Sequence, residues 1–301
     1  MEIANPIYDV VFKYMMEDNA VAKLLVSSII GEKIVSLEPK PQESTKEKDR
    51  DKDKFPDSLT VYHLDFSAKI KTSEGHRVVL IEMQKASLYT DIMRFRGYLG
   101  QQYINESNKV QGKDGSDEAM QIFSIYFLGD DLKICDTPVL SVFPEVRDVA
   151  TQQIVKMKSG FIESLNHKCW IVQISCLKKR RRNELELLLS AFDQSNRDGN
   201  NKHILNVEED EIPEKYRPLF RRLKMAASSK EVKRLMKKED DDLRYLKDMA
   251  RDAENRVAKE KDEVIAQKDK VIAQKDKENE ALRRLIEQLQ IENQKINDKI
   301  G

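Results

Sequence analysis

The chain has 301 residues, of which 40% are hydrophobic and 35% are charged. A core can be buried at this hydrophobic content, but the charged fraction exceeds the roughly 25% of an average globular domain, so part of the chain must be solvated. Lys+Arg and Asp+Glu are equal at 53 each, which excludes a global positive field as the means of attracting nucleic acid.

Several classes of protein are disfavoured by what the sequence lacks. No basic segment followed by an apolar run opens it, and no apolar run reaches the roughly 18 residues of a membrane span, so we expect a cytoplasmic protein that does not enter a membrane. The cysteines Cys135, Cys169 and Cys176 show no CxxC spacing and the four histidines are scattered. We therefore expect no disulfide framework, no zinc site and no organic cofactor.

The first 57 residues divide into an ordered and a solvated part. Apolar residues at helical spacing predict a helix over 10–30, ended by Gly31. Residues 38–57 are charged, contain proline and offer almost nothing to bury, which predicts a low-complexity loop within the domain.

Two strands follow. In 61–70 apolar and polar residues alternate, and Asp65 falls on the polar side. The turn TSEGH, with Gly75 able to take a positive φ, joins this strand to a second one over 77–85, RVVLIEMQK. The second strand is apolar on both faces, as in the middle of a sheet, yet it ends with Glu82 and Gln84 on one face.

Asp65 and Glu82 come within a few ångströms if the hairpin register pairs them. Two ionised carboxylates in a partly desolvated site repel each other, so a divalent cation is their natural third party, and oxygen ligands without His or Cys select Mg²⁺, with Mn²⁺ as a substitute. The alternative is that both carboxylates face solvent at the strand ends.

This ordered set of an acidic strand, a hairpin and Ile81-Glu82-Met83-Gln84 before a helix resembles the PD-(D/E)XK nuclease superfamily, and within it the recombination-promoting nuclease and putative transposase group. The resemblance covers roughly residues 5 to 195, including the opening Asp9-Val-Val-Phe12-Lys13 and the helix after the second strand.

The resemblance implies a restriction-endonuclease-like α/β core, with a central mixed sheet flanked by helices, and cleavage of phosphodiester bonds in DNA. Asp65 and Glu82 would be the metal ligands and catalytic residues. Gln84 would stand where the superfamily has lysine; an amide can hydrogen-bond water or phosphate but carries no charge, so activity would be lower or lost.

On the helix after the second strand, Thr90 can act as the N-cap, and Arg94, Tyr98 and Gln101 share a face. Arg94 could hold a scissile phosphate that Gln101 orients, or it could be an ordinary exposed arginine. Asp9 and Lys13, four residues apart, could form a surface ion pair, while the resemblance implies a role in substrate binding.

Two further strands are expected at 121–128 and 167–177, and the second runs into Lys178-Lys179-Arg180-Arg181-Arg182. These five cations could bind DNA phosphates, or they could be the solvated flank of a helix that begins near Asn183.

Composition changes near residue 225, which predicts a nuclease-like domain over 1–225 and a helical coiled-coil tail over 226–301. VIAQKDK occurs at 264–270 and again at 271–277, and Leu282, Ile286, Leu289, Asn293, Ile296 and Ile300 follow at steps of four and three. Such a seam favours a homodimer through residues 281–301, with Asn293 as its polar member; a solitary charged helix is the alternative.

The sequence as a whole predicts a Mg²⁺-dependent DNA endonuclease dimerised by its tail, since two linked active sites can cut both strands. A catalytically inactive nuclease fold that serves as a DNA- or protein-binding module is the main alternative. A purely structural coiled-coil adaptor with an unrelated head is the third.

Overall fold

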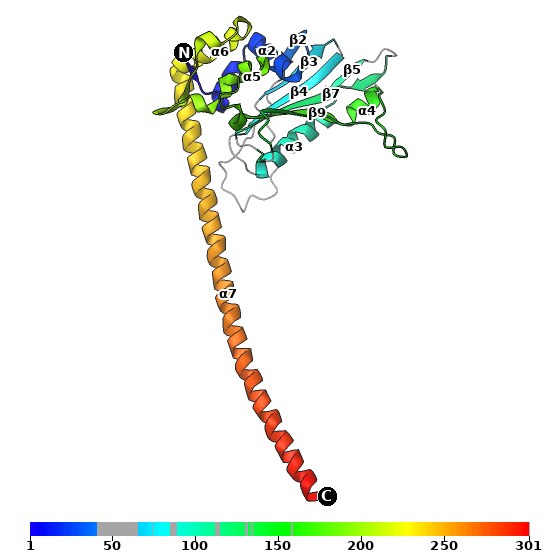
Figure 1. The fold of residues 1–301 in the computed structure, drawn as a ribbon, viewed down its shortest axis with the longest axis vertical. Coiled ribbons are helices and arrows are strands. Elements are labelled where there is room, and N and C mark those ends of the chain that lie inside the picture. The colour runs from blue at the N-terminus through cyan, green and yellow to red at the C-terminus, as the bar shows by residue number, and fades with distance from the viewer. Residues whose placement is uncertain are drawn as a thin grey trace. The chain divides into compact units, whose positions relative to one another are not determined.

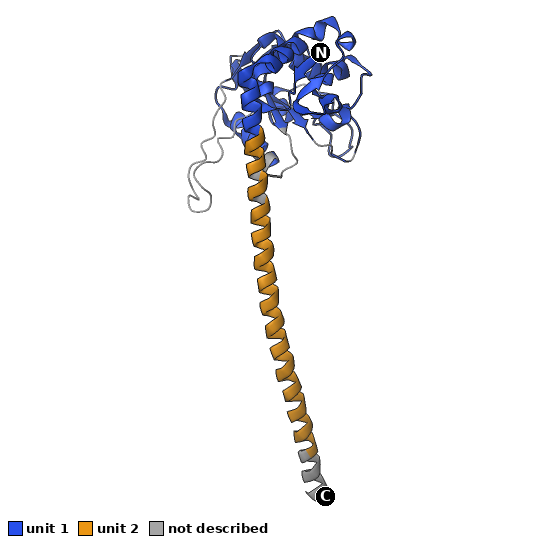
Figure 2. Cartoon of the chain, turned by 90° about the vertical axis from the view of Figure 1, so that its left-hand side faces the viewer, with its two compact units in different colours: residues 1–239 blue, residues 240–301 orange. Residues whose placement is uncertain are grey.

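A computed structural model describes residues 1–40, 66–73, 75–84, 89–111, 115–129, 132–133, 135–157 and 159–300; for residues 84, 89–91, 94, 246, 250 and 292–300 it describes the backbone alone. The chain forms two compact units, residues 1–239 and 240–301 (Figure 2). Within the described residues, no helix is both long and apolar enough to cross a bilayer.

The centre of the first unit is a six-stranded mixed sheet, which confirms the α/β class expected from the sequence (Figure 1). Its strands, in spatial order, are β2 (Ser36–Pro39), β3 (Phe66–Thr72), β4 (Gly75–Gln84), β7 (Gln121–Leu128), β9 (His167–Gln173) and β8 (Val139–Val142). The pairs β4–β7 and β7–β9 are parallel, and the other neighbours are antiparallel. The carboxyl ends of β4, β7 and β9 therefore meet at one edge.

The expected hairpin is confirmed in β3 and β4, whose register runs from Thr72 opposite Gly75 to Phe66 opposite Ile81. Gly75 has φ of +123°, a conformation that L side chains rarely adopt. An added Cβ there would also lie 3.1 Å from Nη1 of Arg77. The glycine thus allows the tight connection that sets which residues of the two strands face each other.

Helices cover both faces of this sheet. One face packs against α1 (Asp9–Met16), α2 (Asn19–Ile30), α5 (Glu184–Leu189) and α6 (Arg217–Ser228), and buries Phe12, Phe123, Phe127 and Phe192 in the larger apolar cluster. The opposite face carries α3 (Tyr89–Ile104) with a smaller cluster around Leu80, Phe95 and Tyr98. Figure 1 shows α3 on the other side of the sheet from α2 and α5.

The single helix expected over 10–30 is wrong in one respect, because two helices occupy this segment. The break lies at Asp18, whose carboxylate accepts hydrogen bonds from the backbone N–H groups of Ala20 and Val21 and so caps α2. The expected stop at Gly31 is confirmed, with φ of 75° at the C-cap.

Two other boundaries differ from expectation. The strand expected over 167–177 ends at Gln173, and Ile174–Leu177 is a 3-10 helix. Ile174 and Leu177 both join the larger core cluster; three residues per turn directs them to one side, whereas strand alternation would direct them to opposite faces. The loop expected from residue 38 begins later, since Glu38 and Pro39 pair with β3; residues 41–57 lie outside the described part of the chain.

Smaller elements complete the first unit. They are β1 (Glu2–Ala4), β10 (Arg197–Asp198) and β11 (Asn201–Asn206) in a second sheet, β5 (Lys109–Gln111) with β6 (Asp117–Ala119), the helix α4 (Gly160–Ser164), and the 3-10 helices Ile174–Leu177, Ser190–Phe192, Gln194–Asn196, Glu209–Glu211 and Glu214–Tyr216.

The long C-terminal helix α7 runs over Lys230–Ile300, 71 residues. The expected division at 225/226 lies inside α6, whereas the compact units divide between Glu239 and Asp240. Residues 230–239 of α7 belong to the first unit, and Val232 and Met236 are buried in its larger core.

Candidate functional site

Glu82 lies near the carboxyl end of the interior strand β4 and is 1% exposed. By strand alternation it shares a face with Val78 and Leu80, which belong to the cluster under α3. Ile81 and Met83 point to the opposite face and join the larger core. The sequence predicts Glu82 at the end of a buried strand. In the structure its side chain is itself buried, beneath α3.

Two rows of residues cross the parallel strands at this edge. Glu82 is the register partner of Tyr126 on β7, which in turn is the partner of Ile171 on β9. The next row on the same face consists of Gln84, Leu128 and Gln173. These rows place Glu82 next to Tyr126 of β7, and Gln173 of β9 lies one strand further along the same edge.

Tyr126 and Gln173 were not identified from the sequence. Tyr126 is 6% exposed and its ring meets that of Phe95 on α3 edge-on, with 4.8 Å between centroids. In β7, QIFSIYFL, the polar Ser124 and Tyr126 are two residues apart and so share a face. That spacing is the signal that could have pointed to Tyr126.

Gln173 is fully buried and holds the loop after β7 at the carboxyl edge. Its Oε1 accepts a hydrogen bond from the backbone N–H of Leu132 at 2.7 Å, and its Nε2 donates to the carbonyl of Thr137 at 2.7 Å. Nε2 also lies 3.5 Å from Sγ of Cys135. This loop is therefore fixed at two points at the sheet edge where β4 also ends.

A cysteine shares this face of the sheet. Cys169 is the register partner of Ser124. Burial raises the pKa of the Cys169 thiol, and the neighbouring Ser124 hydroxyl only partly opposes this. The neutral thiol is a poor nucleophile and a poor metal ligand, so the groups available for chemistry here are oxygen and amide donors.

The structure leaves three predicted site residues partly or wholly undescribed. Asp65 lies outside the described residues. Gln84 is the last residue of β4 and Arg94 lies in α3, and for both only the backbone is described. Their chain positions agree with the expected strand and helix.

On α3 the predicted polar face is only partly observed. Tyr98 is 4% exposed and packs on the sheet, while Gln101 is half-buried. The next residue, Gln102, is the buried glutamine: its Oε1 accepts hydrogen bonds from Nζ of Lys40 at 3.0 Å and Nδ2 of Asn108 at 3.0 Å. Gln102 thus ties the end of α3 to the residues after β2 and was missed by the sequence reasoning.

Asp9 and Lys13 form an ion pair with each other, with Nζ 2.7 Å from Oδ2. They lie on α1, which packs on the face opposite to Glu82. Phe12 between them meets Phe127 of β7 edge-on, at 5.8 Å between centroids. The structure therefore brings this pair to the same end of the sheet as Glu82 but to the other face.

The five cations at 178–182 behave in two ways: the arginines form ion pairs within the protein, and the lysines are exposed. The three arginines bind carboxylates: Arg180 to Asp136 at 2.7 Å, Arg181 to Asp193 at 3.2 Å and Arg182 to Glu186 at 2.7 Å. Lys178 and Lys179 are exposed, and neither has an ion pair within the described residues.

Buried carboxylates give this run its shape. Asp193, 0% exposed, accepts the backbone N–H of Lys179 at 2.9 Å, and Lys179 has φ of +51°. The Arg182 guanidinium holds the pKa of the Glu186 carboxyl below its usual value. As expected, a helix follows, capped by Asn183, whose Oδ1 accepts the backbone N–H of Glu186.

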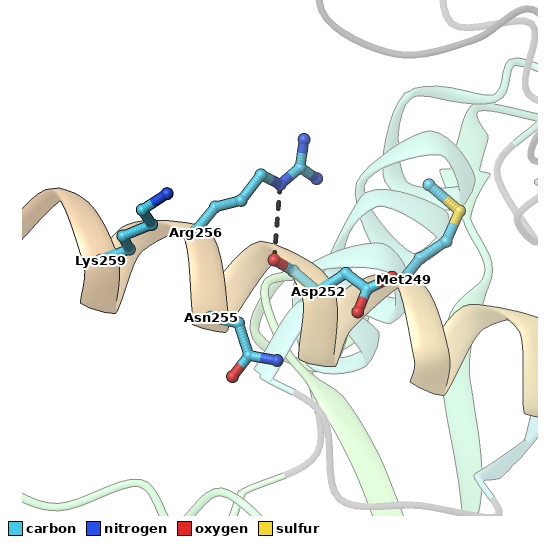
Figure 3. Close-up of a pocket in the computed structure, with 5 residues that line it drawn as sticks. All are labelled: Met249, Asp252, Asn255, Arg256 and Lys259. Carbon is cyan, nitrogen blue, oxygen red and sulfur yellow. Dashed lines mark hydrogen bonds between the residues drawn. The ribbon is translucent and has the colours of Figure 1, made fainter.

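In the second unit, α7 carries a hollow lined by Met249, Asp252, Asn255, Arg256 and Lys259 (Figure 3). All five residues come from one helix, and the Arg256 Nε donates a hydrogen bond to the carbonyl of Asp252 at 3.4 Å. One convex helix cannot enclose a ligand, so this hollow is an open surface and carries no chemistry.

Within the described residues, no group of three or more His, Cys, Asp or Glu side chains is arranged to hold a metal ion. Asp65, one of the two expected ligands, is outside that search. Comparisons with protein-family models, with curated proteins and with solved structures find no match to this chain.

Proposed function

We propose that the first unit is a Mg²⁺-dependent DNA endonuclease of the PD-(D/E)XK type. The observation that carries the proposal is Glu82, a buried carboxylate near the carboxyl end of an interior strand. A buried ionised carboxylate is costly unless a cation or hydrogen bonds compensate for its lost hydration, so such a position favours a functional reason for the charge.

The hairpin register supports a second ligand. Phe66 pairs with Ile81, the residue before Glu82. We propose that the antiparallel pairing extends by one more residue, which would set Asp65 opposite Glu82, and paired residues of neighbouring strands have Cβ atoms about 5 Å apart. Two carboxylates at this separation fit one divalent cation, whose oxygen ligands lie at roughly 2.0–2.6 Å.

The donor set on the α3 face fits Mg²⁺ or Mn²⁺. Glu82 would supply a carboxylate oxygen, the neutral Cys169 thiol does not compete as a soft ligand, and hard oxygen donors select these ions over zinc. When bound, the ion would polarise the phosphoryl oxygen and stabilise charge on the leaving oxygen.

The protein's own residues would position the substrate. Gln84, one strand period beyond Glu82, can donate a hydrogen bond to phosphate or accept one from the attacking water. Because an amide carries no charge, it stabilises the transition state less than the lysine found at this position in most of the superfamily. Arg94 on α3, and Gln101 seven residues later on the same predicted face, would hold the phosphate.

The net charge of the chain does not favour DNA, so the support for DNA as the substrate comes from a local group of positive side chains. Lys178 and Lys179 are exposed and follow the carboxyl end of β9, the same sheet edge at which Glu82 lies. The three arginines after them are engaged by carboxylates. We therefore assign the phosphate contacts of this run to the two lysines rather than to all five cations.

We further propose that the chain self-associates through residues 281–301, which would hold two sites together for cleavage of both strands. The amide at Gln84 also favours a second candidate function, a catalytically inactive nuclease fold that binds DNA, because it removes the usual charged catalytic group.

A plasmid-cleavage assay with Mg²⁺ or Mn²⁺ present or withheld tests the proposal. We expect metal-dependent nicking that is lost in Asp65→Ala and in Glu82→Ala and kept in Asp117→Ala, a matched change at an exposed carboxylate of β6. DNA binding by a chain that never nicks, with either metal, would favour the inactive binding module instead.

A further inference from the structure

Beyond Asp240, α7 exposes a stripe of large apolar side chains, which Lys268, Lys275 and Asn279 interrupt. Leu282, Ile286 and Leu289 are 55%, 53% and 53% exposed, and Ile265 and Ile272 extend the stripe toward the start of the helix at 55% and 57%. Scattered apolar residues on a surface are ordinary, whereas a stripe repeating every seven residues is the seam of a coiled coil.

We propose that the partner of this stripe is a second copy of the chain, and that the two copies of α7 pair in parallel and in register as a two-stranded coil. The inference rests on the self-association proposed above and is independent of nuclease activity. Two features of the seam argue for the parallel orientation.

The first feature is the position of the polar residues in the seam. In the heptad, Asn279 and Ile286 occupy a positions, and Leu282 and Leu289 occupy d positions. In a parallel in-register pair each seam residue meets its own copy, so asparagine meets asparagine and leucine meets leucine. Lys268 and Lys275, at d positions, also meet their own copies, so the coil is weak before residue 281 and firm after it. The later Asn293 is also at an a position and would again be matched with itself.

An antiparallel pair cannot achieve this match, because each a residue then faces a d residue. If Ile286 lay opposite Leu282 of the partner, Asn279 would lie opposite Leu289. If Ile286 lay opposite Leu289, then Asn293 would lie opposite Leu282. Either arrangement puts an amide into an apolar layer without a hydrogen-bond partner, which destabilises the pair.

The second feature is a charge pair across the seam. Glu278 is at a g position and Arg283 at the following e position, five residues later. In a parallel coil these positions face each other between the two helices, which sets orientation. Within one helix they do not meet, since side-chain neighbours there are three or four residues apart. The described partner of Glu278 in its own helix is Gln274, at 3.1 Å.

Orientation decides where the two candidate sites are attached. A helix of 71 residues spans about 105 Å at about 1.5 Å per residue. Parallel pairing joins both first units to the same end of the coil, whereas antiparallel pairing joins them to opposite ends. Only the parallel coil would therefore tether two sites closely enough to act on one stretch of duplex.

Disulfide cross-linking of the full-length chain tests the orientation. In a variant whose three native cysteines are serine, we expect Asn279→Cys and Asn293→Cys, both at a positions and each made alone, to form covalent dimers on oxidation. Glu287→Cys, on the outer face of the helix, is the control and should not. In the antiparallel registers above, both test positions would lie far beyond the roughly 7 Å between Cα atoms that a disulfide spans.

Charge exchange tests the same geometry with the native cysteines present. Glu278→Arg and Arg283→Glu should each weaken the dimer roughly 10-fold, since two symmetric pairs become repulsive, and the double variant should restore it. Sedimentation gives the readout. A monomeric full-length chain would overturn the self-association, and a trimer would overturn the two-stranded coil. A dimer without cross-links at residues 279 and 293, or without rescue, would overturn the parallel orientation. Cleavage by a tailless chain tests the nuclease separately.

Discussion

Glu82 and Tyr126 are register partners on the parallel strands β4 and β7, and both side chains are buried under α3. The register therefore sets a carboxylate beside an aromatic ring, and both side chains are shielded from bulk water. If a divalent cation compensates for that charge, the metal and the fold should stabilise each other.

We therefore expect Mg²⁺ to raise the thermal unfolding temperature of the wild-type chain and to leave that of Glu82→Gln unchanged, because binding to the folded state alone shifts the unfolding equilibrium. Glu82→Gln keeps the volume of the side chain and removes its charge. Differential scanning fluorimetry with and without Mg²⁺ makes the measurement, and Asp117→Asn serves as the control. An equal Mg²⁺ response in Glu82→Gln would show that this carboxylate does not bind the ion.

Gln84→Ala should lower plasmid cleavage by roughly 10²-fold or more, the usual effect of removing one preorganised hydrogen-bond donor. Gln84→Lys should retain or raise cleavage, because an ammonium group adds charge stabilisation beside two neutralising carboxylates. Initial nicking rates at saturating Mg²⁺ provide the comparison. Loss of cleavage in Gln84→Lys together with full activity in Gln84→Ala would place Gln84 away from the chemistry.

The double variant Lys178→Ala, Lys179→Ala should weaken DNA binding and reduce the slope of log affinity against log salt by about 2, because each lysine that neutralises a phosphate accounts for roughly one unit of that slope. Fluorescence anisotropy over a range of salt concentrations measures both quantities. Lys237→Ala, Lys238→Ala is a matched double change at exposed positions of α7. An unchanged salt slope in the first variant would exclude these lysines from the DNA interface.

Arg182→Ala should destabilise the first unit in a pH-dependent way. The Glu186 pKa is held below its ordinary value of 4.5 in the folded state, first by the hydrogen bond from Arg182. A depressed carboxyl pKa contributes stability above the unfolded pKa, and this contribution is lost as pH falls through the folded pKa.

The stability difference between wild type and Arg182→Ala should therefore be full above pH about 4.5 and shrink below it. Urea unfolding at several pH values measures it. A difference that stays constant down to about pH 3 would mean that the ion pair does not set the Glu186 pKa.

A chain that ends at Glu239 should fold and be monomeric, because the compact first unit ends there. A chain that ends at Ser229 should be less stable by about 2–5 kcal/mol, since it lacks the buried Met236 as well as Val232. Urea unfolding and sedimentation of the two truncations make the comparison. Equal stability would show that the start of α7 is not part of the first core.

The sequence alone determined the features that depend on local chemistry and periodicity. Alternation in 61–70, the apolar run of 77–85 and the glycine at 75 predicted the hairpin, and Gly31 predicted a helix end. Each prediction follows from the conformations that a few adjacent residues can adopt. The long helix could also be predicted from local sequence, since no proline or glycine interrupts 219–300.

Only the tertiary structure decided which distant groups meet. The pairing of Glu82 with Tyr126 depends on the parallel crossover from β4 to β7, and the fate of the cation run depends on Asp136, Asp193 and Glu186, whose positions relative to the arginines no local pattern encodes. The burial of Met236 likewise depends on packing with the first unit. Periodicity fixes the direction of a side chain within its own element, whereas its neighbours are fixed by how the elements pack.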